Sequence, residues 1–327
     1  MKTVGLFFGG PSNEHEVSIN SAKNIVKNFP AAKYKLALVY WDKQGYFYLV
    51  KDINKLKKFR KKINLEDFKK LFDLVLPITH GQYGEDGVLQ SLLESQKIKY
   101  CGCRALSSAL CMDKGLFKTY LLGHKINQVK FLVLDYELDN NKTLALKLSQ
   151  VRRNFKLPLY IKSANSGSSV GITKVENFSK IQFALKEALK YDNKVVIEEG
   201  LVKPKEIEVA ILGNKELKIS QPGELELAKD FYNYDDKYNL GQAKVIVPAN
   251  ISRAQAKEIK ILASQVYKLC ACSGFARVDF FIARNKIFVN EINSLPGFTD
   301  ISMYPLLMTA NGLSYQKLIE KILQLAY

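Results

Sequence analysis

Residues 4–18 read VGLFFGGPSNEHEVS, an apolar run that ends at two glycines and gives way to polar and acidic residues. The run at 4–8 is typical of a buried β-strand that leads into a turn. Between residues 18 and 29 the apolar residues recur at helical spacing, which predicts an amphipathic helix. A buried strand followed directly by a helix predicts that the chain begins with an α/β unit.

The alternation of strand and helix patterns continues beyond this unit. Residues 36–41 and 71–78 are predicted to form strands, and the second is followed by His80 and Gly81. The alternation predicts a parallel sheet, in which ligands bind at the carboxyl ends of the strands. Gly9-Gly10 and His80-Gly81 fall at such ends, so this edge of the sheet is a candidate binding site.

The rest of the chain contains further strand and helix patterns, and we predict an α/β fold with α+β character. Arg284-Asn285 suits a tight hairpin turn between the last two strands. Strands are predicted at residues 129–134, 159–162, 194–198, 206–212, 274–283 and 286–292, and helices at 181–189, 254–269 and 313–325.

The chain of 327 residues carries a formal net charge of +17, mostly from lysine. Much of this charge lies in residues 51–70, which we interpret as the solvated face of a helix. A positive field attracts nucleic acids, membrane surfaces and anionic small molecules. No aromatic stacking platform or zinc-finger spacing accompanies the lysines, so we expect no nucleic-acid partner. Positive potential would help to recruit an anionic substrate.

No apolar run approaches the roughly 20 residues that a membrane-spanning helix needs. The apolar N-terminal run is too short for a signal peptide, and Gly9-Gly10, Glu14 and Glu16 follow it at once. We therefore expect a cytoplasmic protein with no membrane partner.

The odd count of five cysteines does not suggest disulfides. We interpret them as reduced, small apolar residues, with a metal site between the two C-x-C pairs as the alternative.

Residues 165–171 read NSGSSVG and follow the predicted strand that ends at Lys162. Small residues let backbone N–H groups approach phosphate oxygens, and serine hydroxyls add donors. The loop matches neither the P-loop nor the dinucleotide-binding fingerprint. Taken alone, it leaves open a flexible hairpin loop.

Two polar triplets lie near the end of the chain, Arg277-Val278-Asp279 and Glu291-Ile292-Asn293. In each triplet the outer residues lie two apart on a predicted strand, so they point to one face. If the strands pair, two carboxylates and an amide oxygen converge, which suits Mg²⁺ bound to phosphates. Arg277 on the same face suits a phosphate or a developing oxyanion. A surface cluster of salt bridges is the alternative.

A series of motifs follows one order along the chain. They are residues 9–18 (GGPSNEHEVS), His80-Gly81 with residues 84–87 (GEDG), Met112-Asp113-Lys114, Lys162 with residues 167–171 (GSSVG), Lys237-Tyr238, Arg277-Val278-Asp279, and residues 290–299 (NEINSLPGFT). As a set they resemble the D-alanine–D-alanine ligase family. The resemblance covers essentially the whole chain, and its first and last motifs are long and specific.

This resemblance implies the ATP-grasp fold, with an N-terminal parallel α/β domain and two further domains that clamp ATP. The expected domains are residues 1–102, 103–202 and 203–327, and the last carries the metal site and a lid loop within 223–241. The implied activity is ATP-dependent ligation of two D-alanines through an acyl phosphate, for peptidoglycan precursor synthesis. ATP and Mg²⁺ are the implied cofactors, with Mn²⁺ as an alternative metal, and the family suggests a homodimer.

The resemblance also implies roles for individual residues. Glu16, Ser168 and Tyr238 would orient the amino acids and hold the lid closed, while Arg277 and the backbone of Gly297 would stabilise the oxyanion. His80, Ser302 and Met303 would contact the amino acids. The implied ATP-binding residues are Lys114, Lys162, Ser169, Glu198, Glu199, Leu201, Glu206, Lys237, Phe281 and Asn290. The implied metal ligands are Asp279, Glu291 and Asn293.

Several other functions compete with this interpretation. Relatives that join D-alanine to D-lactate often carry histidine in the lid, and residues 223–241 contain none, which favours the dipeptide. D-serine as the second substrate stays open, as does another ATP-grasp ligase. A dinucleotide-binding oxidoreductase would need a G-x-G-x-x-G loop that the first strand lacks. A basic nucleic-acid-binding module is the remaining alternative.

Overall fold

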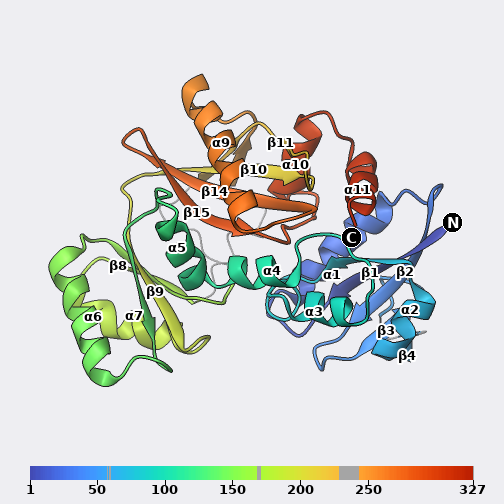
Figure 1. Cartoon of the computed structure of the whole chain (residues 1–327), viewed down its shortest axis with the longest axis horizontal. Helices are drawn as coiled ribbons and strands as arrows, with labels where there is room; N and C mark the ends of the chain where they lie inside the picture. Colours follow the sequence, from blue (N-terminus) through green and yellow to red (C-terminus); the bar gives the residue numbers. More distant parts are fainter. Residues whose placement is uncertain (57, 59, 168–170, 228–242, 327) are drawn as a thin grey trace.

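Three β-sheets and the helices that cover them form the structure of this chain, as seen in Figure 1. The coordinates come from a computed structural model and describe all residues except 57, 59, 168–170, 228–242 and 327. Each sheet is built from a different part of the chain, and we number the sheets from the N-terminus.

The first sheet contains the predicted parallel strands. Its order is β4-β3-β2-β1-β5, and β1 pairs in parallel with both β2 and β5. An antiparallel pair, β3 and β4, extends the sheet beyond β2. The strands are β1 (Lys2–Gly9), β2 (Tyr34–Trp41), β3 (Phe47–Val50), β4 (Arg60–Ile63) and β5 (Leu74–Ile78). The helices of this part are α1 (His15–Lys27), η1 (Leu65–Asp67), α2 (Phe68–Leu71) and α3 (Val88–Ser95).

The lysine-rich stretch 51–70 is not the helix that we predicted. It contains the edge strand β4, followed only by η1 and the short α2. Ile63 is the one buried residue of β4, while Arg60 and Lys62 lie over the rings of Tyr48 and Tyr46, at 4.3 and 3.4 Å from the ring centroids. The chain pairs as a strand because Ile63 is buried there and the basic side chains keep the sheet edge solvated.

The second sheet has the order β6-β9-β7-β8, with antiparallel pairing between the neighbouring strands. Its strands are β6 (Phe131–Asp135), β7 (Leu159–Ser163), β8 (Ile172–Val175) and β9 (Lys194–Glu199). Its helices are α6 (Asn141–Asn154), η2 (Phe178–Lys180) and α7 (Ile181–Ala188). The apolar residues of these elements form a separate core.

The third sheet has the order β13-β12-β10-β14-β15, and β11 pairs with β10 beside this path. The strands are β10 (Lys205–Leu212), β11 (Lys218–Ile219), β12 (Gly223–Leu227), β13 (Ala243–Ile246), β14 (Phe275–Ala283) and β15 (Lys286–Asn293). Helix α9 (Arg253–Leu269) packs against it in one core. The predicted hairpin turn is confirmed, because Arg284 and Asn285 both have positive φ values, 49° and 61°.

The first and third sheets share one apolar core. Helices α10 (Met303–Ala310) and α11 (Tyr315–Gln324) contribute apolar residues to it together with α1 and β1, and Figure 1 shows α11 near the C-terminus. Asn24 Nδ2 on α1 donates to the carbonyl oxygen of Phe298, at 3.0 Å. The shared core brings the carboxyl ends of β1 and β5 close to the end of β15.

Two consecutive helices, α4 (Ala105–Met112) and α5 (Lys114–Gly123), connect the first sheet to the second. Asp113 separates them and caps α5, where its side chain accepts a hydrogen bond from the N–H of Leu116 at 2.9 Å. This cap sets the start of α5, so that Lys114 is its first residue.

All five cysteines are free thiols and buried, as predicted. Cys111 and Cys272 lie with their Sγ atoms 3.8 Å apart, in the core that also holds Cys103 and Cys270. The described part of the chain contains no group of three or more His, Cys, Asp or Glu side chains placed to hold a metal ion. Among the same residues, no helix combines the length and the apolar character needed to cross a membrane.

Candidate active site

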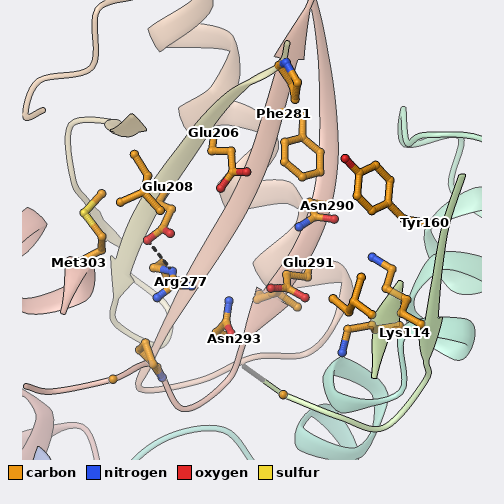
Figure 2. A pocket seen from close by; sticks show the side chains of 18 of the residues that line it. Lys114, Tyr160, Glu206, Glu208, Arg277, Phe281, Asn290, Glu291, Asn293 and Met303 are labelled. Carbon is orange, nitrogen blue, oxygen red and sulfur yellow. Dashed lines mark ion pairs between the residues drawn. The ribbon is translucent and has the colours of Figure 1, made fainter. Parts of the chain in front are cut away.

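A cavity of about 1150 Å³ is lined by strand residues of the second and third sheets, and by Glu14, Val17, His80 and Glu85 from α1 and the loops beside the first sheet. Figure 2 shows its central part, with residues of β10, β14 and β15 facing Lys114 and Tyr160. The predicted site residues that line it are His80, Lys114, Lys162, Glu198, Glu199, Leu201, Glu206, Arg277, Phe281, Asn290, Glu291, Asn293, Gly297, Ser302 and Met303. The structure therefore brings together residues as far apart in the sequence as His80 and Met303.

His80 follows β5 and lines the cavity. Its Nε2 lies 3.0 Å from Ser21 Oγ, and its Nδ1 lies 3.2 Å from the carbonyl oxygen of Leu295. Burial lowers the pKa of His80 to about 4, although the Leu295 carbonyl opposes the shift. The imidazole is thus neutral at physiological pH, and it can donate one hydrogen bond and accept another without adding charge to the site.

The structure places Glu14 in the cavity wall, in place of the predicted residue Glu16. Glu16 is exposed and is absent from the described residues that line the cavity, whereas Glu14 is buried and lines it. The loop before α1 is held to the turn at His80, because Ser12 Oγ donates to the His80 carbonyl at 2.6 Å. Gly81 is required there: a Cβ atom at this residue would lie 2.9 Å from Glu14 Oε2, and its φ is +79°.

Glu85 is a second carboxylate at this end that the sequence reasoning did not assign. It lines the cavity near Glu14 and Lys114. Burial and the nearby charge of Glu14 raise the pKa of Glu85 well above its usual value, while the Gly81 backbone and Lys114 oppose the shift. Its position within the GEDG motif, just after the predicted strand, was the signal that could have identified it.

The wall formed by the second sheet carries the basic side chains. Lys114 Nζ donates to the carbonyl oxygen of Ser166 at 2.6 Å and so ties α5 to the glycine-rich loop. Lys162 Nζ lies 2.8 Å from Glu198 Oε2. Burial alone would raise the pKa of Glu198, but Lys118 and Lys162 lower it to about 2. Lys114, Lys162 and the fixed carboxylate of Glu198 therefore line this wall.

Aromatic rings stand on two facing walls of the cavity. Tyr160 comes from β7 and Phe281 from β14, and Figure 2 shows both rings reaching into the same space. Glu199, Leu201 and Glu206 line the cavity as well. Flat apolar faces beside hydrogen-bonding groups can hold a planar, polar heterocycle.

The wall formed by the third sheet contains the predicted polar cluster. Strands β14 and β15 pair with Arg277 opposite Asn293 and Asp279 opposite Glu291, so the four side chains lie in neighbouring positions. The register shifts between Asp279 and Phe280, so that Val289 pairs with Phe280 and Asn290 occupies the bulge. The predicted convergence of these residues follows directly from this pairing.

Charged contacts hold Arg277 in one orientation. Its Nε and Nη2 donate to Oδ1 and Oδ2 of Asp279, both at 2.7 Å. Its Nε also lies 2.8 Å from Oε2 of Glu208, a residue of β10 that the sequence reasoning missed (Figure 2). Glu208 pairs with Asp279 across β10 and β14, so only the strand register identifies it.

The donor set at this wall fits a hard divalent cation. Glu291 and Asn293 line the cavity, while Asp279 is not among its described lining residues and accepts a hydrogen bond from Asn293 Nδ2 at 2.9 Å. Two carboxylates and an amide group are oxygen-rich ligands of the kind that Mg²⁺ shares with substrate phosphates. Figure 2 shows Glu291 and Asn293 on the same side as Arg277.

Gly297, Ser302 and Met303 line the cavity near the start of α10. Ser302 Oγ accepts a hydrogen bond from the N–H of Thr299 at 3.0 Å, which closes the turn before α10.

Four predicted residues, Ser168, Ser169, Lys237 and Tyr238, lie outside the described residues. The first part of the expected lid, residues 223–227, is strand β12 instead of loop.

Comparisons with known proteins agree with this arrangement. The family model for the D-ala D-ala ligase N-terminus matches residues 3–103, and that for the D-ala D-ala ligase C-terminus matches residues 121–324. D-alanine–D-alanine ligase B of Clostridium tetani is 43% identical, over 99% of this chain and 93% of the relative.

Solved structures give the same result. The D-alanine–D-alanine ligase from Coxiella burnetii is 34% identical with a TM-score of 0.86, over 99% of this chain and 93% of that one. The VanG D-Ala:D-Ser ligase from Enterococcus faecalis is 32% identical with a TM-score of 0.89, over 99% of both chains. Since both family models match in order and whole-chain relatives share this architecture, the chain belongs to the D-alanine–D-alanine ligase family and has its ATP-grasp fold.

Proposed function

We propose that this protein joins two D-alanine molecules into D-alanyl-D-alanine, with ATP converted to ADP and phosphate, as a step in making peptidoglycan precursors. One observation carries the proposal: a single cavity joins the basic wall of Lys114 and Lys162, the polar cluster at Arg277, and the buried side chains of Glu14 and His80. These are the groups that phosphoryl transfer and amide formation between amino acids require.

The chemistry explains why one site needs both kinds of group. A carboxylate is a poor electrophile because its negative charge repels a nucleophile. Transfer of the γ-phosphoryl group to the first D-alanine gives an acyl phosphate, and ADP leaves. The amine of the second D-alanine then attacks the carbonyl carbon, phosphate departs, and the amine loses a proton. Positioning and charge stabilisation account for most of the catalysis of phosphoryl transfer.

The placement of the side chains supports the proposed residue roles. Lys114 and Lys162 would bind phosphate oxygens, and Tyr160 and Phe281 would flank the adenine near Glu198, Glu199 and Leu201, with Glu206 on the ribose. Arg277 and the N–H of Gly297 would stabilise the oxyanion, where losing one donor typically costs about 10²–10³ in rate.

At the amino-acid end, we assign to Glu14 the role expected of Glu16. Glu14 is buried in the cavity wall beside His80, where a carboxylate can bind the ammonium group of the first D-alanine. His80, Ser302 and Met303 would contact the amino acids. Ser168, Ser169, Lys237 and Tyr238 keep their proposed roles in the glycine-rich loop and the lid.

Asp279, Glu291 and Asn293 would hold Mg²⁺, or Mn²⁺ in its place. The support is the chemistry of the donor set and the register that places the three side chains together. A bound divalent ion supplies neutralisation of phosphate charge. The chain's own contribution is to orient Arg277 beside that charge through Asp279 and Glu208.

We also propose a homodimer, a cytoplasmic location, and domain divisions near residues 102 and 202. The domain divisions are supported by the separate β-sheets on either side of each division. The location is supported by the need for ATP.

A second candidate function is ligation of D-alanine to D-serine. The observation that favours it is the structural similarity to the Enterococcus faecalis D-Ala:D-Ser ligase. Against it, Met303 and Leu306 present apolar side chains to the cavity near Ser302, which suits a methyl group better than a hydroxymethyl group.

The test is phosphate release from ATP and Mg²⁺ with D-alanine, L-alanine, D-alanine plus D-serine, D-alanine plus D-lactate, or no acid, with mass analysis of the products. We expect release with D-alanine and the mass of D-alanyl-D-alanine. A mixed D-alanyl-D-serine product in excess would support the second function. No release with any alanine, from protein that binds ATP, would contradict both.

A further inference from the structure

Lys118 is a buried lysine for which the proposed mechanism has no use. It lies on α5 with its side chain 1% exposed, and its Nζ lies 2.9 Å from Oε1 of Glu198. It is not among the described residues that line the cavity. An ammonium group is costly to bury unless a partner compensates its charge, so the position of Lys118 depends on Glu198.

Glu198 is held from two sides. Its Oε1 faces Lys118, and its Oε2 lies 2.8 Å from Nζ of Lys162. Glu198 and Lys162 both line the cavity, whereas Lys118 lies behind the wall. Glu198, Lys118 and Lys162 together have a net charge of +1. One lysine can therefore bind an anionic ligand while the other stays paired with Glu198.

The two lysines differ in what happens when ATP binds. In the proposed function Lys162 is a phosphate ligand, and a lysine that turns toward phosphate weakens its hold on Glu198. Lys118 is 1% exposed and its contact with Glu198 does not compete with phosphate. The second cation is therefore the one that can keep Glu198 in place during binding.

We propose that Lys118 is a positioning residue for nucleotide selection, which holds the ionised carboxylate of Glu198 where it accepts a hydrogen bond from the 6-amino group of adenine. The inference rests on the proposed function only in taking ATP as the nucleotide. An ionised carboxylate accepts hydrogen bonds and cannot donate them. It therefore favours adenine over guanine, whose 6-oxo group is also an acceptor, and over purine, which has only hydrogen at position 6.

The experiment measures nucleotide binding by calorimetry with Mg²⁺, for ATP, GTP and purine riboside triphosphate, in the wild-type protein and in Lys118→Met. A hydrogen bond to a charged group corresponds to roughly ten- to a hundredfold in affinity. We expect wild type to prefer ATP over purine riboside triphosphate by about tenfold or more, and Lys118→Met by about threefold or less. A folded Lys118→Met protein with the wild-type preference would overturn the proposal.

Lys194→Met is the matched control. Lys194 Nζ lies 2.7 Å from Asp113 Oδ2, so this lysine also joins β9 to the start of α5. It is absent from the described cavity lining, and its ion pairs are with Asp113 and Asp135. We expect Lys194→Met to keep the preference for ATP. An equal loss of preference in both variants would mean that packing of α5 on β9 is responsible, and would overturn the proposal.

Lys118→Met leaves a buried carboxylate with one cation, and this change can unfold a protein. The double variant Lys118→Met with Glu198→Gln removes both charges and is compared with Glu198→Gln alone. Because Lys118 acts through Glu198, we expect the two to differ by less than about twofold in their preference for ATP. A further loss of preference in the double variant would contradict the proposed role.

Binding and ligation are measured separately, so the two proposals can fail independently. A wild-type protein that binds ATP selectively but releases no phosphate with D-alanine would refute the proposed ligation and leave the role of Lys118 testable. A protein that ligates D-alanine but binds purine riboside triphosphate as tightly as ATP would refute the role of Lys118 alone.

Discussion

The carboxylate of Glu14 lies directly against Gly167: a Cβ atom built on this glycine would be 2.4 Å from Glu14 Oε2. The loop after β1 and the glycine-rich loop after β7 therefore touch at the cavity, although they are far apart in the sequence. No side chain fits at residue 167 unless the carboxylate of Glu14 moves.

Gly167→Ala should impair turnover more than stability. The contact is with the end of a side chain that can rotate away, so we expect a change in unfolding free energy of about 1 kcal/mol or less. The displaced carboxylate should lower kcat/KM by about tenfold or more. Phosphate release and thermal unfolding measure the two effects. Gly123→Ala is the control, because a Cβ there meets nothing within 4 Å. Wild-type turnover in Gly167→Ala would contradict the assignment.

Glu14→Gln and Glu16→Gln distinguish the two acids of the first motif. Glu14 is buried in the cavity wall and Glu16 is exposed. Loss of a charged hydrogen bond to the substrate ammonium should lower kcat/KM for D-alanine about ten- to a hundredfold in Glu14→Gln. Glu16→Gln should stay within about twofold of wild type. The reverse order in steady-state kinetics would restore the role first predicted for Glu16.

Glu291→Gln should raise the Mg²⁺ concentration needed for half-maximal activity by about tenfold or more. Asp279→Asn should do the same and should also reduce kcat at saturating Mg²⁺, because Asp279 orients Arg277 through two hydrogen bonds of 2.7 Å. Titration of activity with Mg²⁺ separates the effects, with the exposed Glu258→Gln as control. An unchanged Mg²⁺ requirement in both variants would remove this cluster from the metal site.

His80 should make the protein less stable in mild acid. Its pKa is lowered by burial from 6.5 to about 4, so the unfolded chain binds the extra proton first as the pH falls. The contribution of His80 to stability is complete above pH 6.5 and is lost as the pH falls toward 4, by at most about 3 kcal/mol.

Urea unfolding of wild type and His80→Gln at several pH values measures this effect. The stability of His80→Gln should fall less than that of wild type between pH 6.5 and 4, since glutamine does not titrate. Equal losses in the two proteins would show that other groups cause the acid sensitivity.

The strands and helices were largely predictable because their patterns are local. The apolar run at 4–8 lies within β1, and the last hairpin turns at Arg284 and Asn285 as predicted. Residues 51–70 do not form the predicted helix, because a run of charged residues does not by itself specify helical periodicity. Pairing of β4 with β3 is a long-range contact that overrides local preference.

The choice between Glu14 and Glu16 shows where a motif stops being informative. Both acids lie in the same ten-residue motif, and its sequence does not say where the helix begins. Helix α1 begins at His15, and residues two positions apart on a helix point to nearly opposite sides. Only the start of α1 decided that Glu14 faces the cavity and Glu16 faces solvent.

The sequence by itself determined the family through its ordered motifs, and the resemblance to that family implied the ATP-grasp fold and many of the functional residues that line the cavity. Strands, helices and turns were also predictable, because periodicity and turn chemistry are properties of neighbours in the chain. Tertiary structure alone decided which buried charged groups form ion pairs with one another. Lys118 meets Glu198, and Arg277 meets Glu208, only through packing of α5 on β9 and pairing of β10 with β14. Such partners are chosen by the register of strands and the burial of charge, which depend on contacts between residues distant in the sequence.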